Sequence, residues 1–207
     1  MLPRMEFTIA VGLPLNSKSI AARLFWEAFS AKLERLLHSE KKALRWLEDA
    51  IDPAFAFGAV RPDGTLIGVA GFKTHDGAFL RVTLADMARY YGWFGGIWRG
   101  LLLSRLERET AAAQILIDVI FVAAVARGLG VGSALLSEIK AEAARRDLAE
   151  VQLDVIDSNP RARALYERHG FVAGETSHLG PLHHLFGFRS APTMVFTRAP
   201  IGSNRKA

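Results

Sequence analysis

The residues that most clearly suggest chemistry lie in the stretch ARGLGVGS, where Arg127 is followed by Gly128, Gly130 and Gly132. An apolar run typical of a buried strand precedes this stretch, and an amphipathic run typical of a helix follows it. Backbone N–H groups at the start of a helix favour an anion, and so does the helix dipole. Glycines let a ligand approach the backbone, and a guanidinium suits phosphate. The stretch therefore predicts a phosphate or pyrophosphate site, with glycines that serve packing alone as the alternative.

Two common phosphate motifs do not fit this loop. A Walker loop ends in Gly-Lys-Ser or Gly-Lys-Thr, and the loop has neither ending. A dinucleotide-binding fold places its glycines in the first strand–helix unit, with an acidic residue about 20 residues further on that binds the ribose. This loop comes late in the chain. The acidic residues within range, Asp147 and Glu150, are expected to end the helix and to begin the next strand.

Asp118 and Tyr166 are the candidates for acid–base chemistry. Asp118 is the only charge in the apolar run LIDVIFV, and a charge in a central strand needs a partner or a function. Strict alternation places it on the same side as Leu116, Ile120 and Val122. A general base fits there as well as a salt bridge or hydrogen bond to a neighbouring loop. Tyr166 lies on a predicted helix, and its phenol, of pKa about 10, can donate a proton at neutral pH; packing between helix and sheet is the alternative.

The spacing of apolar residues predicts the elements that must position these groups. Helices are expected at residues 15–29, 31–49, 82–92, 96–110, 130–147 and 159–170. Strands are expected at residues 54–60, 66–73, 114–125, 150–157, 171–179 and 192–199. The turn RPDGT between the first two strands is typical of a hairpin. This order predicts a mixed α/β sheet flanked by helices, with one βαβ crossover at its centre.

Composition limits the kinds of protein that this chain can be. Its 207 residues suit a single domain over 1–207, in which 202–207 form a flexible tail. The net charge of +5 is spread along the chain, so no nucleic-acid partner is expected. The absence of cysteine excludes thiolate metal sites and a cysteine nucleophile, and it fits a cytoplasmic protein without a metal. The most apolar stretch, 90–103, is broken by Arg99 and is shorter than the ~20 residues of a membrane span.

Two motifs together resemble the GNAT N-acetyltransferase superfamily. The loop resembles its acetyl-CoA motif, Arg/Gln-x-x-Gly-x-Gly/Ala, at Arg127, Gly130 and Gly132. The stretch LDVIDSNPRARALYERHGFV is similar to the next strand–helix–strand element of that family, with Asn159 and Tyr166 at matching places. The resemblance covers about residues 115–175. It implies a GNAT-like fold in which the segment 80–112 is a helical insertion before the central strand. One departure is Ala124, where many members of the family have proline.

The resemblance implies a role for each residue of the site. Backbone groups of Ile120, Phe121 and Val122 are expected to bind the pantetheine arm, and the Val122 N–H to stabilise the oxyanion. The pyrophosphate is expected beside Arg127, on the backbone amides of Gly128, Leu129, Gly130, Val131, Gly132 and Ser133. Further cofactor contacts are expected from Asn159, Ala162, Leu165 and Tyr166. Tyr166 is the expected general acid and Asp118 the expected general base, with a chain of water molecules or no base at all as the alternatives.

The expected activity is transfer of an acetyl or other short acyl group from its coenzyme A thioester to a primary amine. Attack is expected to be direct, in a ternary complex. The aromatic stretch in 80–112 favours a small apolar or aromatic amine, if it forms a wall of the acceptor pocket. It would equally suit plain core or the surface of a homodimer. A lysine or N-terminal amine of a protein is the alternative acceptor, and a coenzyme A-binding module without turnover is the alternative function.

Overall fold

The computed structural model describes residues 6–37, 39–81, 86, 89–90, 113–178 and 190–198. Most of the expected insertion at 80–112, with its aromatic stretch, lies outside the described residues. The loop around His183 and His184 and the tail at 202–207 lie outside them as well. The predictions made for the insertion and for the tail therefore remain predictions.

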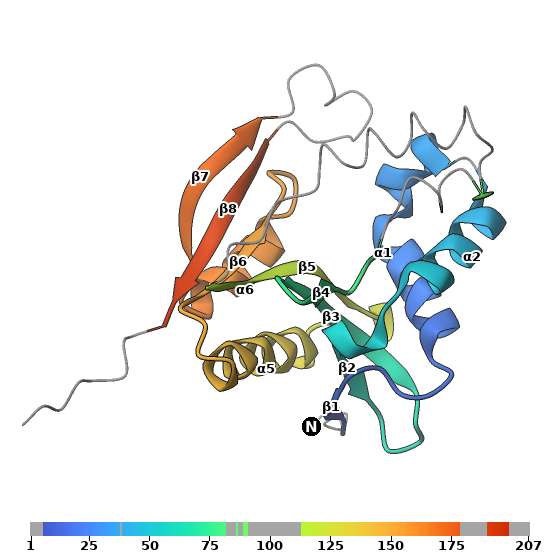
Figure 1. Cartoon of the computed structure of the whole chain (residues 1–207), viewed down its shortest axis with the longest axis horizontal. Coiled ribbons are helices and arrows are strands. Elements are labelled where there is room, and N and C mark those ends of the chain that lie inside the picture. The colour runs from blue at the N-terminus through green and yellow to red at the C-terminus, as the bar shows by residue number, and fades with distance from the viewer. Residues whose placement is uncertain are drawn as a thin grey trace, which may run out of the picture.

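A single mixed sheet organises the described chain (Figure 1). Its strands lie in the order β1 (Thr8–Val11), β2 (Ala56–Val60), β3 (Leu66–Thr74), β5 (Gln114–Val122), β6 (Glu150–Asp154), β8 (Ser190–Thr197) and β7 (Val172–His178). The short β4 (Gly77–Ala78) pairs with β3. Only β5 and β6 pair in parallel; the other neighbouring strands are antiparallel. The predicted mixed sheet with one central crossover is therefore confirmed.

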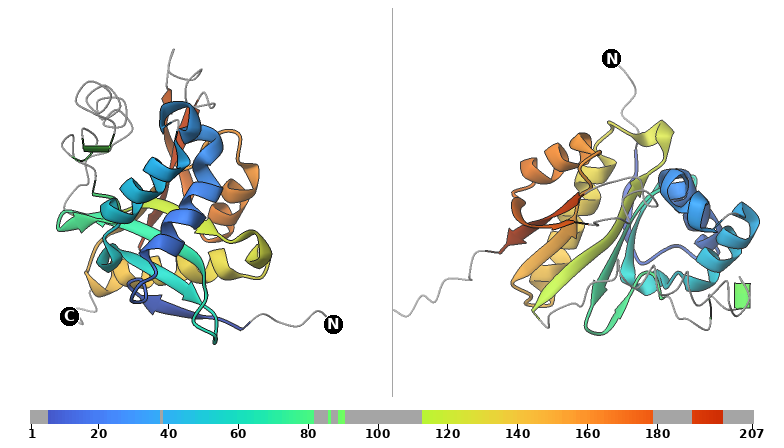
Figure 2. Two further views of the ribbon diagram at one scale, coloured as in Figure 1. Left: turned by 90° about the vertical axis from the view of Figure 1, so that its right-hand side faces the viewer. Right: turned by 90° about the horizontal axis from the view of Figure 1, so that it is seen from above.

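Helices cover both faces of this sheet, as Figure 2 shows. The crossover helix α5 (Val131–Arg145) and the helix α6 (Pro160–Arg168) pack on one face, where Leu135, Ile139 and Tyr166 join the larger apolar cluster. On the other face lie α1 (Lys18–Leu37) and α2 (Glu40–Ala50), which form a second apolar cluster with the sheet. The sheet is thus buried on both sides at its centre, as its apolar strands require.

A β-bulge at Asp118 interrupts strand β5 where it pairs with β3. Gly71 is opposite Val119 and Phe72 is opposite Ile117, so the register of the two strands skips Asp118. An extra residue reverses the alternation of side chains beyond it. As a result Ile117 and Ile120 belong to the same apolar cluster. The predicted face shared by Leu116 and Ile120 is therefore wrong, because strict alternation assumed an unbroken ladder.

The predicted hairpin is confirmed, whereas two short strands were not predicted. In the turn between β2 and β3, the Arg61 N–H donates to the Thr65 carbonyl at 3.0 Å, and Gly64 has a positive φ of 84°. The unpredicted strands are β1 and β4, which are too short for alternation to be recognised. The first two helices meet around Ser39, the N-cap residue of α2, several residues later than predicted.

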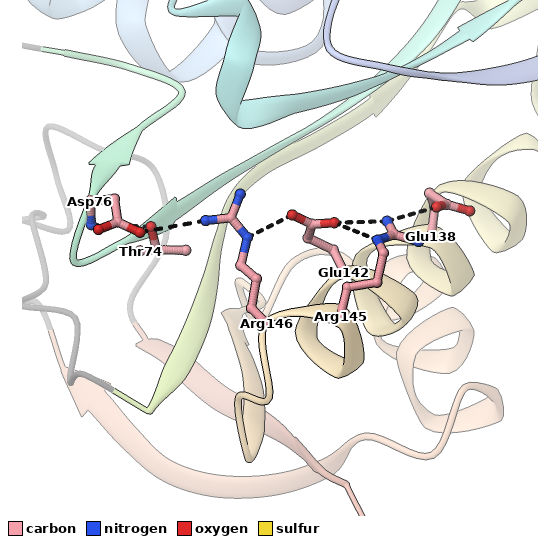
Figure 3. A network of polar contacts seen from close by, with 6 residues as sticks. All are labelled: Thr74, Asp76, Glu138, Glu142, Arg145 and Arg146. Carbon is pink, nitrogen blue, oxygen red and sulfur yellow. Dashed lines mark hydrogen bonds and ion pairs between the residues drawn. The ribbon is translucent and has the colours of Figure 1, made fainter.

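An ion-pair network holds the C-terminal half of α5 against the β3–β4 hairpin (Figure 3). Arg146 Nε donates to Glu142 at 2.6 Å, and the same guanidinium lies 3.6 Å from Asp76. Arg145 contacts Glu142 at 2.8 Å and Glu138 at 2.9 Å. Burial favours the neutral form of Glu142, but hydrogen bonds from both arginines outweigh it and lower the pKa of this carboxyl. The network therefore fixes the helix whose other end carries the glycine loop.

Candidate active site

A cavity of about 120 Å³ opens where β5 and β6 separate. The two strands pair from Gln114 and Glu150 as far as Ile117 and Leu153. The cavity begins at this point and is lined by Phe29, Ile117, Asp118, Val119, Ile120, Leu153, Asp154, Val155, Ile156, Asn159, Ala162 and Tyr166. A water molecule takes about 30 Å³ in the liquid, so this volume suits the reacting ends of two substrates rather than a whole cofactor. Five predicted site residues come together here: Asp118, Ile120, Asn159, Ala162 and Tyr166.

The cavity joins the two faces of the sheet. Ile120, Ala162 and Tyr166 belong to the apolar cluster on the side of α5 and α6. Phe29 and Val119 belong to the cluster on the side of α1. Side chains from the two layers therefore meet in one cavity.

The glycine loop forms the start of α5. Gly128 and Gly130 have φ of 78° and 86°, in the region that favours glycine, and Gly130 is the N-cap residue. No side chain caps this helix end, and its first backbone bond runs from the Ala134 N–H to the Gly130 carbonyl. The amides of Val131, Gly132 and Ser133 precede that bond, so the helix supplies them with no acceptor. These backbone donors lie where the sequence predicts a phosphate or pyrophosphate site, and that site remains a prediction.

Side chains around the loop differ in what they do. Leu129 is 41 % exposed, whereas Val131 is buried, so Val131 can offer a ligand only its backbone. Arg127 is exposed, and its Nε donates to the Val122 carbonyl at 3.1 Å. This bond ties the loop to the end of β5.

Helix α6 connects this loop with the cavity. A Cβ placed on Gly132 would lie 3.2 Å from Leu165, so glycine allows α5 and α6 to approach closely. At the N-terminus of α6, Asn159 accepts a hydrogen bond from the Ala162 N–H at 3.2 Å. The cap uses the side-chain oxygen of Asn159, whose amide NH₂ is a separate donor. Asn159, Ala162 and Leu165 thus follow one line from the cavity to the start of α5.

Tyr166 is the most buried polar side chain that lines the cavity. It is 5 % exposed, and its ring lies 6.0 Å from that of Phe171. Burial raises the pKa of its phenol to about 12, because the charged phenolate would lose its hydration. The phenol therefore stays protonated throughout the neutral range. It can act as a hydrogen-bond donor. The position of Tyr166 is compatible both with a packing role and with a role in the reaction.

The backbone of β5 alternates between β3 and the cavity side. The Ala123 N–H donates to the Ile67 carbonyl, and the ladder places Phe121 opposite Val69. In an antiparallel ladder only every second residue directs its N–H and C=O to the partner strand. Ile120 and Val122 therefore direct theirs to the open edge. Phe121 directs its own to β3, and its side chain joins the α1 cluster, so this geometry does not favour its expected contact with the pantetheine arm.

Sequence reasoning did not identify Asp154 and Phe29 as site residues. Asp154 is the last residue of β6, and Phe29 comes from α1, on the other side of the sheet. Phe29 has the spacing of an ordinary core residue of a helix. Asp154 falls inside the strand expected at residues 150–157, where a polar residue between Leu153 and Val155 is typical of an exposed face. Only the separation of the two strands shows that both side chains face one cavity.

Two searches among the described residues gave negative results. No cluster of three or more His, Asp or Glu side chains in the described ranges is arranged to hold a metal ion. Of the helices described, none is both long and apolar enough to cross a membrane.

Comparison with known families identifies the class of protein. The model of the acetyltransferase (GNAT) family matches residues 20–171. Because this match covers most of the sequence, the chain belongs to the GNAT acetyltransferase family. It is accordingly an acyltransferase. A search of curated proteins found no match.

Solved structures agree with this fold. An N-acetyltransferase from Staphylococcus aureus Mu50 aligns with a TM-score of 0.63 and 13 % identity, over 91 % of this chain and 100 % of that one. A GCN5-related N-acetyltransferase from Kribbella flavida aligns with a TM-score of 0.61 and 19 % identity, over 93 % of this chain and 98 % of that one. At such identities the likeness concerns the fold, and the acceptor must be argued from the site.

Proposed function

We propose that the protein transfers an acetyl or other short acyl group from its coenzyme A thioester to a primary amine. The observation that carries this proposal is the cavity between β5 and β6, which Asp118, Asn159 and Tyr166 line together. Acetyl-CoA is the acyl donor that the family uses. The uncapped start of α5, beside Arg127, suits its pyrophosphate.

The thioester arm would run along the open edge of β5. Ile120 directs its backbone donor and acceptor there, and Val122 directs its N–H there, whereas the Val122 carbonyl accepts from Arg127. These groups suit the amides of pantetheine. Asn159, Ala162 and Leu165 would form the opposite wall. The Val122 N–H is our candidate for the donor that stabilises the oxyanion formed during attack.

The reaction needs no covalent intermediate with the enzyme. The amine nitrogen loses a proton to Asp118, directly or through water, and attacks the thioester carbon. The C–S bond then breaks, and the sulfur leaves with the bonding electron pair as a thiolate. The products are the N-acyl amine and coenzyme A, and the proton from Asp118 returns to solvent.

Tyr166 would act on the leaving sulfur mainly as a hydrogen-bond donor. The pKa of its phenol is about 12, whereas that of an ordinary thiol is about 8.5. Full proton transfer to the thiolate is therefore uphill by about 5 kcal/mol. A hydrogen bond to the developing thiolate requires no proton transfer, so this free-energy cost does not arise. Tyr166 can donate this bond at any pH at which its phenol is neutral.

The direct test is thiol release from acetyl-CoA in the presence of primary amines. We expect release with at least one small amine such as phenethylamine, and an N-acetyl product by mass spectrometry. Tyr166→Phe should lower turnover about 100-fold with little change in coenzyme A affinity. Tyr90→Phe is the matched control, because it removes a phenol that does not line the cavity.

Other results would favour the alternatives. Turnover of peptide lysines or N-terminal amines, but of no small amine, would indicate a protein acceptor. Coenzyme A binding without thiol release for any acceptor would indicate a binding module. Equal turnover by Tyr166→Phe and the parent enzyme would leave Tyr166 with a packing role only.

A further inference from the structure

The two aspartates of the cavity occupy equivalent positions on neighbouring strands. Strands β5 and β6 pair in register through Ile117 and Leu153, and the next residues are Asp118 and Asp154. Pairing ends at this step, and both aspartates line the cavity that opens there. Like charges directly opposite one another destabilise strand pairing. The pair therefore stands where the sheet separates and where the reaction is proposed.

The cavity is acidic although the chain as a whole is basic. The described residues that line it include two carboxylates and no lysine, arginine or histidine. The whole chain has a net charge of +5. Carboxylates that face a small cavity favour a cation and disfavour an anion. A primary amine at neutral pH is such a cation, in its ammonium form.

Asp154 is held in a defined orientation. Thr193 on β8 is its cross-strand partner, and the Thr193 Oγ1 donates to Asp154 Oδ1 at 2.8 Å. Thr193 is 7 % exposed, whereas Asp154 is exposed at the end of β6, so this bond is partly buried. The Val155 N–H donates to the Pro192 carbonyl at 3.1 Å and holds the next step of the ladder. These bonds fix the carboxylate on a strand, which positions a binding group better than a loop does.

An aromatic ring contributes to the same cavity from the other face of the sheet. Phe29 lines the cavity, and its ring is held 4.8 Å from Phe25 and 6.4 Å from Phe121. The face of an aromatic ring attracts a cation, and it also packs well against an apolar carbon chain. A ligand with an ammonium group and an apolar or aromatic body could therefore interact with the carboxylates and pack against the Phe29 ring.

We propose that Asp154 is the residue that selects the acceptor, by binding it as an ammonium ion between Asp118 and Asp154. This inference rests on the proposed acyl transfer and names its substrate class, a cationic primary amine with an apolar body. Asp118 then takes one proton from the ammonium nitrogen, whose lone pair attacks the thioester carbon. As the C–S bond breaks, the acylated nitrogen gives up a second proton, which the departing thiolate or solvent takes. Asp154 stays anionic and keeps the nitrogen in place.

The first test measures binding without turnover. Isotope-labelled protein saturated with coenzyme A is titrated with phenethylammonium chloride, and separately with the neutral analogue 2-phenylethanol, while backbone amide NMR signals are followed. We expect the amides of Asp118 and Asp154 to shift with the amine, which binds about tenfold more tightly than the alcohol. Asp154→Asn should remove this preference. Equal affinity for amine and alcohol, or no shift with millimolar amine, overturns the proposal.

The second test uses kinetics to separate selection from structure. Asp154→Asn keeps an oxygen that can accept from Thr193 but removes the charge. We expect a rise of about tenfold in KM for phenethylamine, with kcat within about twofold and KM for acetyl-CoA unchanged. KM for phenylhydrazine, a nucleophile that is largely neutral at pH 7.5, should stay the same. Asp157→Asn is the control, because it makes the same charge change on a residue that does not line the cavity.

The outcomes distinguish the inference from the proposed function. If Asp154→Asn lowers the melting temperature and leaves KM for the amine unchanged, Asp154 only ties β6 to β8 and the inference is wrong. If the amine binds at the two aspartates but no thiol is released, the inference on binding holds and the proposed acyl transfer fails.

Discussion

Replacing Gly130 with alanine tests the phosphate site most directly. Gly130 caps α5 with a φ of 86°, and a Cβ built there would meet no atom within 4 Å. The added methyl group therefore clashes with nothing in the protein itself. It would instead occupy the open space beside the first amides of α5, where we expect the pyrophosphate to lie.

A second glycine provides a matched control. Gly64, in the turn between β2 and β3, has a φ of 84°, and a Cβ there also meets no atom within 4 Å. Alanine in this conformation costs about 1–2 kcal/mol at either position. Only Gly130→Ala should also weaken coenzyme A binding. Loss of one hydrogen bond to a charged phosphate costs about 1.5–3 kcal/mol, which corresponds to an affinity about 10- to 100-fold lower.

The assay combines urea unfolding with calorimetric titration of coenzyme A for the parent protein, Gly130→Ala and Gly64→Ala. We expect similar losses of unfolding free energy for both variants, and a loss of affinity for Gly130→Ala alone. If Gly130→Ala binds coenzyme A as tightly as the parent does, Gly130 serves the backbone turn only. The assignment of the pyrophosphate to this helix end would then be wrong.

Two further predictions follow from the pKa shifts. Burial raises the pKa of Tyr166 to about 12, from about 10 in the unfolded chain. The stability that the neutral phenol contributes is therefore complete below pH 10 and is lost as the pH rises towards 12. In urea unfolding, the parent should lose about 1.4 kcal/mol of unfolding free energy between pH 9 and 11, and Tyr166→Phe should not. The lowered pKa of Glu142 gives the opposite dependence of stability on pH. The stability that its carboxylate contributes is present above the pKa of the unfolded chain and is lost as the pH falls through the pKa of the folded chain. Glu142→Gln should thus cost about 1 kcal/mol at pH 7 and less at pH 3, and an equal cost at both would refute the role given to Arg145 and Arg146.

Some of the site could be read from the sequence because its chemistry is local. The glycine loop acts through backbone amides and positive φ angles, which depend on the residues of the loop and the helix that follows. Asn159 caps its own helix through a contact with Ala162, three residues further on, so this interaction can be predicted from the local sequence. The βαβ crossover could be predicted as well, because a helix that joins two parallel strands of one sheet almost always makes a right-handed connection.

Other parts depended on contacts between distant segments. The bulge at Asp118 arises from pairing with β3, and the apolar run by itself has no feature that predicts it. It reverses the faces of the residues beyond it, which strict alternation could not foresee. The position of β8 between β6 and β7 brings Thr193 to Asp154, although the two residues lie in distant parts of the chain.

By itself, then, the sequence indicated the family, the glycine loop at the start of one helix, and the order of the described strands and helices apart from β1 and β4. All of these follow from short-range spacing and backbone conformation. Tertiary structure alone decided where β5 and β6 separate, and so which side chains face the cavity. The reason is physical: Phe29, Asp118 and Asp154 come from three elements, and only the packing of α1 on the sheet and the register of the strands brings them together.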